Sequence, residues 1–523
     1  MTKRLLLAIF FIAGISLSTF AQNYYLGVGT EADPQASSCA SCHKTDGIAS
    51  PIYNQWKNTR HAVAQDAVTN PYYGYDCLKC HNTGWDPNTA NYGADEYVIK
   101  DTTKTPNYTI TDQTNWDRVK NVGCESCHGA MGTQNRTLAF SHWLFGTQNK
   151  PNYDAQVCGD CHQDSHHPYM EEWSNSLHAM SASQAFVVNN KRCVKCHVAQ
   201  NFVMYAKDPA NYRDTILVTG ADIQPLSCVT CHDPHANNNP GQLRFAMTST
   251  TSICDECHTS GIDTVDVNVV PHHATSEAFD GGLNFGYRYP GQTYQNSAHT
   301  FAIQNRCVTC HVMTSPYAAG SPAKTGHTFE ARVEACKLCH NDYYTAVDTS
   351  NHLTRFDYRG IQSRTDSLMN ALSTKLANAS SADSATLAFK QANYNLLSAQ
   401  AEGSRGIHNT RLVQKLLRDA LNNFGPVGVE NEINLPVKYE LSQNYPNPFN
   451  PSTMIKFALP EAGQVTLKIY DAIGKEVALL VNESKDAGVH VVNWNGKSFA
   501  SGIYFYSLEV NNFKMVKKML LVK

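Results

Sequence analysis

Residues 124–128 read Cys124-Glu-Ser-Cys127-His128, and this Cys-x-x-Cys-His pattern occurs nine times between Cys39 and His340. The other copies are Cys39/Cys42/His43, Cys77/Cys80/His81, Cys158/Cys161/His162, Cys193/Cys196/His197, Cys228/Cys231/His232, Cys254/Cys257/His258, Cys307/Cys310/His311 and Cys336/Cys339/His340. These copies use all 18 cysteines of the chain, and a histidine follows every pair although only 22 of the 523 residues are histidine. Such regularity indicates one chemical role for every copy.

The pattern is the attachment signature of c-type haem. Two thiols three residues apart add to the two vinyl groups of one porphyrin, and the imidazole of the next residue binds the iron. Positions i, i+3 and i+4 share one face of a helix, so one helical turn presents all three groups to one haem. Zinc sites, redox dithiols and disulfides also use paired cysteines, but none of them needs a histidine at this position. The sequence therefore predicts nine covalently bound haem c groups with their iron.

The start of the chain and its charge indicate where the protein works. Met1–Ala21 is predicted to be a signal peptide, because Lys3 and Arg4 precede the apolar run Leu5–Ala13 and Thr19-Phe-Ala21 fits a cleavage site. The run is shorter than the roughly 20 residues of a membrane span, and we expect no transmembrane segment after cleavage. The net charge of −3 comes without long runs of one sign, so nucleic acid is not an expected partner.

Residues 22–352 are predicted to form a multihaem cytochrome domain of helical and irregular structure. Up to His340 this region is rich in Asn, Thr, Gly, Pro and Tyr and shows little sustained periodicity. Such a chain buries too few apolar side chains to offset its ordering entropy. We therefore expect short helices and long loops wrapped around stacked haems, and no folding without them.

Each iron needs a sixth ligand, and histidines outside the motifs are the main candidates. We predict His61, His142, His178, His235, His299, His327 and His408, together with His272 or His273. The ninth ligand would be His166 or His167, with His167 the chosen residue, or else His352. Methionine is the rival ligand and would raise the haem potential, which keeps Met131, Met180, Met204 and Met313 open.

An internal repeat supports three of these candidates. Trp56 precedes His61 by five residues, Trp173 precedes His178 by five, and a weaker copy has Tyr294 before His299. An aromatic ring that packs on a porphyrin while the next turn presents a ligand would produce this spacing. A purely structural role for the aromatic residues is compatible with it, because the haem is the core.

The motifs resemble those of the multihaem c-type cytochromes. Val122-Gly-Cys124-Glu-Ser-Cys127-His128-Gly129 with the later His142 is similar to a segment of the cytochrome c554-like group, and Trp-x-x-x-x-His-Ala is similar to a pattern of that group and its octahaem relatives. Gly406-Ile-His408-Asn409 resembles a C-terminal feature in which the histidine binds a haem. The resemblance implies electron transfer between closely packed haems, with His142 and His408 as distal ligands.

Some relatives of this kind are enzymes with one open haem that acts on small nitrogen or sulfur compounds. Ammonia-forming nitrite reductases commonly use Cys-x-x-Cys-Lys at the active haem, and this chain has no such motif. A redox enzyme acting on nitrite, hydroxylamine or tetrathionate therefore remains the alternative to an electron carrier. A structural subunit of a haem-bearing filament is a weaker third hypothesis.

The last part of the chain changes in texture twice. Residues 353–425 carry leucines at helical spacing and are predicted to form a helical hairpin packed on the haem domain, with breaks at Ser380 and at Gly403–Gly406 and with Asn409 or Thr410 as a cap. Residues 426–440 are a predicted linker. Residues 441–523 lack cysteine and alternate like β-strands, which predicts a small β-sandwich.

The segment Gln443-Asn-Tyr-Pro-Asn-Pro-Phe-Asn-Pro451 and the closing Lys517-Lys-Met-Leu-Leu-Val-Lys523 resemble the C-terminal sorting domain of the type IX secretion system. This resemblance implies the secretion machinery as a partner and a final location outside the cell or on its surface. An adhesion or carbohydrate-binding sandwich is the alternative. The leading hypothesis is thus a secreted or cell-surface nonahaem cytochrome whose partners are a periplasmic or outer-membrane redox protein and an extracellular acceptor.

Overall fold

The computed structural model describes residues 24–28, 39–44, 52–68, 73–131, 153–236, 238–340, 356–357, 360–425, 436, 438–511 and 513–522. The predicted signal peptide, His142, His352 and most of the linker lie outside these residues. The chain forms two compact units, residues 1–253 with 306–331 and residues 254–305 with 332–523, and each is described by itself. No helix among the described residues is both long enough and apolar enough to cross a membrane.

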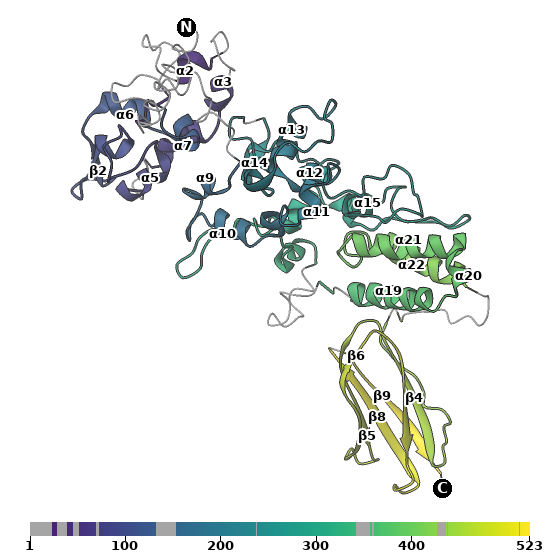
Figure 1. Ribbon diagram of the computed structural model, residues 1–523. Coiled ribbons are helices and arrows are strands. Elements are labelled where there is room, and N and C mark those ends of the chain that lie inside the picture. Colours follow the sequence, from purple (N-terminus) through teal and green to yellow (C-terminus); the bar gives the residue numbers. More distant parts are fainter. Residues whose placement is uncertain are drawn as a thin grey trace. The chain divides into compact units, whose positions relative to one another are not determined.

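The first unit consists of short helices joined by long irregular segments (Figure 1). Its longest described helix, α13, spans only Ala199–Lys207. The others are α2 (Cys39–Cys42), α3 (Tyr53–Trp56), α4 (Ala64–Ala67), α5 (Leu78–His81), α6 (Gln113–Val119), α7 (Cys124–His128), α9 (Gln156–Gly159), α10 (Tyr169–Ser174), α11 (Ala185–Val188), α12 (Val194–His197), α14 (Cys228–Cys231) and α17 (Val308–His311). Strands β1 (Val98–Lys100) and β2 (Tyr108–Ile110) pair antiparallel.

Apolar packing in the first unit is local. A cluster of seven buried residues gathers around Trp116 and Leu78, with β1 and β2 beside it. By contrast, two clusters of sixteen buried residues each lie in the second unit, one among its helices and one between its sheets. The difference agrees with the expectation that haem, rather than apolar side chains, fills the interior of the motif-rich region.

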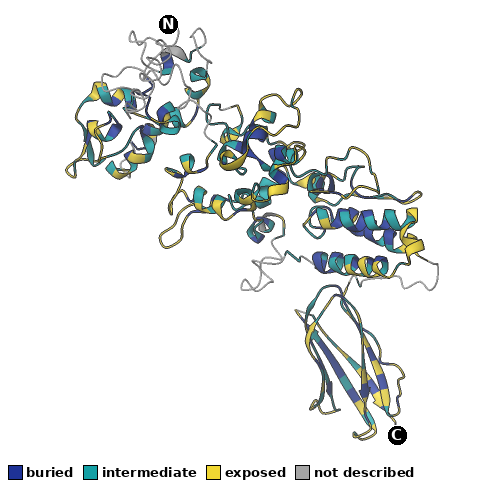
Figure 2. Ribbon diagram, viewed as in Figure 1, coloured by how far each residue is buried: buried dark blue, intermediate teal, exposed yellow. Residues whose placement is uncertain are grey.

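Three long helices dominate the helical part of the second unit, where the sequence predicted a helical hairpin. They are α19 (Ile361–Ala377), α21 (Leu387–Ala401) and α22 (Thr410–Asn423), with the short α20 (Ser381–Ser384) between the first two. Ser380 does not simply break the periodicity, because it caps α20 in a capping box with Asp383. The buried sides of the three long helices face one another (Figure 2).

The three helices also pack against residues 274–289 of the same unit, which follow the motif at Cys254. Ala278 of α15 (Thr275–Asp280) and Phe285 belong to the same buried cluster as Leu372 and Leu416. Short turns complete this part: η8 (Ile253–Glu256), α16 (His299–Ala302) and η9 (Val333–Leu338). Asn409 occupies the N-cap position of α22, but its side chain accepts hydrogen bonds from the backbone N–H and hydroxyl of Ser297 instead of capping the helix.

The C-terminal residues form two antiparallel sheets with a shared core. One sheet has the order β3 (Glu440–Leu441), β4 (Ser452–Leu459), β7 (Gly488–Asn495). The other has the order β6 (Glu476–Lys485), β5 (Gly463–Tyr470), β8 (Gly502–Val510), β9 (Phe513–Leu521). Alternate residues of each strand point into one cluster, which includes Phe457 from the first sheet and Tyr506 from the second. The predicted β-structure of this segment is confirmed.

Candidate haem-binding sites

Cys-x-x-Cys-His motifs fold as single helical turns. In six of them the backbone N–H of the histidine donates to the carbonyl of the first cysteine at 2.7–2.9 Å, which closes one turn. These are the motifs that end at His43, His162, His232, His258, His311 and His340. The two cysteines and the histidine of each such motif therefore lie on one face, as the spacing predicts. The described cysteines are free of disulfides, and the side chain of Cys42 lies outside the described residues.

The second cysteine of five motifs is placed by the same local turn. The backbone N–H groups of Cys161, Cys196, Cys257, Cys310 and Cys339 each donate to the carbonyl of the cysteine three residues earlier, at 3.1–3.2 Å. The side chains of the first four are half-buried, whereas the side chain of Cys339 is exposed. Attachment to a porphyrin should cover each sulfur atom, so Cys339 departs most from the expected surroundings. Haem binding by the motif cysteines stays a prediction from the motif.

Five motif histidines each face a histidine from elsewhere in the chain. The ring centroids are 5.9–6.2 Å apart in every case. The pairs are His162 with His61, His128 with His235, His232 with His327, His258 with His273, and His340 with His299. All five partners come from the set of candidates that the sequence supplies.

The separation fits one metal ion held between two imidazoles. A bond from a metal to an imidazole nitrogen is about 2 Å long, and the ring centre lies about 1 Å beyond the nitrogen, so two such bonds place the centroids about 6 Å apart. Burial lowers the pKa of His61, His128, His232 and His327 below the ordinary value. Burial therefore favours the neutral imidazole, which is the form that binds a metal.

A second feature of metal-binding histidines is present in this chain. In six imidazoles the Nδ1 atom lies 2.6–3.1 Å from a backbone carbonyl oxygen. The residues are His81, His197, His232, His299, His311 and His327. A carbonyl that accepts the Nδ1–H fixes the tautomer and the ring orientation and leaves Nε2 as the ligand atom. The residues present thus fit haem iron with two histidine ligands.

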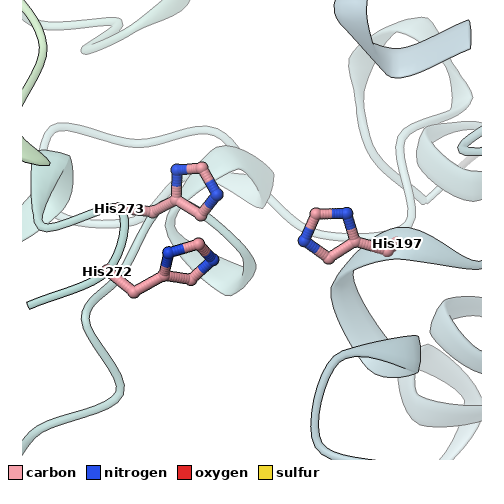
Figure 3. A group of neighbouring side chains, drawn as sticks. All are labelled: His197, His272 and His273. Atoms are coloured by element: carbon pink, nitrogen blue, oxygen red, sulfur yellow. The ribbon is translucent and has the colours of Figure 1, made fainter. Parts of the chain in front are cut away.

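Neighbouring histidines that sequence reasoning left open differ in their surroundings. His273 is the residue that faces His258, whereas the ring of His272 packs against His273 with centroids 4.0 Å apart (Figure 3). His166 is exposed and stacks on Tyr317 with ring centroids 4.1 Å apart, and His167 beside it is also exposed. His178 contacts Phe329, whose carbonyl accepts from His311.

The four methionines that are rival ligands differ in their exposure to solvent. The side chains of Met180 and Met204 are about half exposed. Met131 is buried, and its backbone N–H donates to the carboxylate of Glu125. Met313 is half-buried.

The tryptophans of the repeat make matching contacts. The indole N–H of Trp56 donates to the carbonyl of Val122 at 3.2 Å, and that of Trp173 donates to the carbonyl of Leu226 at 2.8 Å. Val122 and Leu226 each lie two residues before a motif, at Cys124 and Cys228. Each tryptophan therefore positions the residues that directly precede a motif distant in sequence. Tyr294 of the weaker copy differs, because its hydroxyl accepts the backbone N–H of Tyr289.

Thiols of different motifs contact one another within the first unit. Cys39 lies beside Cys124, Cys161 beside Cys80, and Cys158 beside Cys228. In each pair the neighbouring thiol raises the pKa of the first-named cysteine and lowers that of the second, to about 7 for Cys80. The fourth motif thus adjoins the second and the sixth, and the first adjoins the third.

Two buried carboxylates were not singled out by sequence reasoning. Glu125 lies inside the third motif and accepts the backbone N–H groups of Leu26, Gly27 and Met131 at 2.8 Å each. Glu402 accepts the Nδ1–H of His408 at 3.0 Å. The only sequence signal for Glu125 is an acidic residue between two haem-binding cysteines, and Glu402 has none beyond its place shortly before His408.

Comparison with known families agrees with these features. Residues 38–129 match the family described as cytochrome c554 and c-prime, and residues 222–262 match the doubled CXXCH motif family. Residues 443–523 match the secretion system C-terminal sorting domain. No curated protein gives a significant match.

Two solved structures are similar. The outer cell wall cytochrome OcwA has 20% sequence identity and a TM-score of 0.46, and the match covers 67% of this chain and 76% of that one. The undecahaem cytochrome from the S-layer of Carboxydothermus ferrireducens has 20% identity and a TM-score of 0.44, over 66% of this chain and 55% of that one.

Proposed function

The chain is a multihaem c-type cytochrome with a C-terminal secretion sorting domain, and we propose that it is a nonahaem electron carrier that works outside the cell or on its surface. In this proposal the two cysteines of each motif bind one haem and the motif histidine binds its iron. His61, His235, His273, His299 and His327 supply sixth ligands to the motifs whose histidines they face.

The single observation that carries the proposal is the set of five imidazole pairs near 6 Å. Bound haem supplies one-electron oxidation and reduction at its iron. Two imidazoles at one iron leave no position for a substrate, so these five sites favour electron transfer over chemistry on a bound molecule. The carbonyls that hold Nδ1 in six imidazoles keep the ligands in place during oxidation and reduction.

The contacts between thiols support a connected route in the first unit. Cys158 and Cys161 of the fourth motif touch Cys228 and Cys80, so the second and sixth motifs meet at the fourth. Motifs that share such contacts hold their haems as neighbours, which is the requirement for transfer from one haem to the next.

Low-temperature electron paramagnetic resonance of the oxidised protein tests the proposal. A carrier with histidine on both sides of each iron gives low-spin signals alone. A high-spin ferric signal that changes when nitrite or hydroxylamine is added would contradict the proposal and favour a redox enzyme.

The sorting domain carries the second part of the proposal. Its two sheets have their own core, and the match to the sorting domain covers residues 443–523. We expect the type IX secretion machinery to recognise this domain and the cytochrome to exchange electrons with a periplasmic or outer-membrane redox protein and an extracellular acceptor. A chain that ends at Pro436 should remain in the periplasm, as measured by protease accessibility on intact cells. Unchanged surface exposure of that chain would overturn the sorting role.

A further inference from the structure

The loop between α21 and α22 contains a carboxylate that is closed off from water. Glu402 follows the last residue of α21 and is 1% exposed. Its Oε2 atom accepts from the backbone N–H of Ser404 at 3.2 Å, the Ser404 hydroxyl at 2.6 Å and Nδ1 of His408 at 3.0 Å. Its Oε1 atom accepts from the backbone N–H of Gly406 at 2.7 Å.

These four donors identify the state of the carboxyl group. A protonated carboxyl would bring a donor of its own, whereas an ionised one only accepts. Burying an ionised carboxylate costs several kcal/mol unless its charge is compensated. Three of the four donors are backbone N–H groups or a hydroxyl. The fourth is the imidazole of His408, whose ring electrons respond most strongly to the charge of the carboxylate.

The same contact fixes His408. Its Nδ1–H is committed to Glu402, and its backbone N–H donates to the Ser404 hydroxyl at 3.0 Å. The loop that holds it is tightly built, because a Cβ on Gly406 would lie 2.7 Å from Oγ1 of Thr365. The other ring nitrogen, Nε2, would be the atom that binds the iron.

A comparison within the chain shows what is special about His408. The six imidazoles with Nδ1 against a carbonyl, such as His299 with the carbonyl of Ile407, donate to a neutral acceptor. His408 donates to a full negative charge. Charge-assisted hydrogen bonds are about twice as strong as neutral ones, and a carboxylate on the far nitrogen raises the basicity of a histidine ligand.

We propose that Glu402 is a positioning residue that makes His408 a more electron-donating ligand than the histidines whose Nδ1 faces a carbonyl, and thereby lowers the reduction potential of the haem that His408 binds. His235 also lies near a carboxylate, but its Nδ1 is 3.6 Å from Oδ1 of Asp233, a longer contact. The inference rests on the proposed function and on the sequence-based assignment of His408 as a haem ligand. A stronger donor stabilises ferric over ferrous iron, so the potential of this haem would be lower than with a neutral acceptor at Nδ1.

Substitution of the holoprotein tests the inference through the potential of one haem. His408→Ala first identifies the haem, because its low-spin resonance is lost. Glu402→Gln keeps the size and removes the charge, and a redox titration followed by that resonance should then show a rise in potential. We expect at least a tenfold change in the one-electron equilibrium constant, which equals about 59 mV. Glu402→Asp keeps the charge but lengthens its contact with His408, so its rise in potential should be smaller than that of Glu402→Gln.

Asp366→Asn is the matched control. Asp366 pairs with Arg405 of the same loop at 2.9 Å, and its substitution should leave the potential unchanged. An unchanged potential in Glu402→Gln overturns the inference while leaving the electron-carrier function intact. Persistence of every low-spin signal in His408→Ala overturns the ligand assignment and the inference with it. If Glu402→Gln fails to take up haem, the potential of Glu402→Asp is measured instead. Its longer contact with His408 should give a smaller rise in potential, and no rise would refute the role of Glu402.

Discussion

Removal of the Glu125 carboxylate should release the segment Tyr24–Val28 from the third motif. The segment approaches this motif through the N–H groups of Leu26 and Gly27, which both donate to Oε2 of Glu125, while Oε1 accepts from Met131. Glu125→Ala leaves three backbone donors without their acceptor, and each unsatisfied buried donor costs about 1–3 kcal/mol. We take the lower end, since water enters part of the space, which gives about 3 kcal/mol in the free energy of local opening.

Hydrogen exchange measured by mass spectrometry on the holoprotein reads this quantity directly. A loss of about 3 kcal/mol corresponds to a roughly 100-fold faster exchange of the amides in the segment. Glu96→Ala is the matched control, because Glu96 also accepts two backbone N–H groups, from Asn91 and Tyr92, but is exposed. Water replaces the Glu96 carboxylate there, and the effect should stay below about 0.5 kcal/mol. Equal exchange rates in the segments bound by the two carboxylates would refute the reasoning.

Three further outcomes follow from individual contacts. Burial raises the pKa of Glu125 to about 7 from 4.5. The stability that protonation of Glu125 contributes is therefore complete below pH 4.5 and is lost as the pH rises through 7. The free energy of unfolding should fall by about 3 kcal/mol over that range, and denaturant titrations of Glu125→Gln should lack this fall. Trp173→Phe removes the 2.8 Å bond to Leu226 and should lower the unfolding free energy by about 1 kcal/mol in the same titration, with no change if the ring alone matters. His61→Ala should convert one haem from low to high spin in electron paramagnetic resonance while His166→Ala changes nothing, and an unaltered spectrum removes His61 from the ligands.

The spacing of residues in the sequence predicted those features that depend only on residues close together in the chain. The turn formed by each motif follows from positions i, i+3 and i+4, and alternation along Val465–Tyr470 predicted a strand of the C-terminal domain. The sequence also carried the signals at Ser380 and at Gly403–Gly406 that separate three helices. Long helices lie on both sides of each break, and the predicted helical hairpin did not state how many helices the two breaks would produce.

The pairing of histidines with motifs could not be derived from the sequence. His61 faces His162, about a hundred residues later, and His327 faces His232, which precedes it. Nothing in local spacing encodes contacts over such distances. His273, which has a positive φ of 51°, faces His258, and nothing in the adjacent pair His272-His273 indicates which of the two does so. The contact of Trp56 could not be derived either, since its partner Val122 lies just before the distant motif at Cys124.

Mass spectrometry of proteolytic peptides from the mature protein tests the central claim most directly. The account predicts that each of the nine peptides with a Cys-x-x-Cys-His sequence carries the added mass of one haem, including the peptide with the exposed Cys339. Free thiols at these positions, or a disulfide between neighbours such as Cys80 and Cys161, would contradict it.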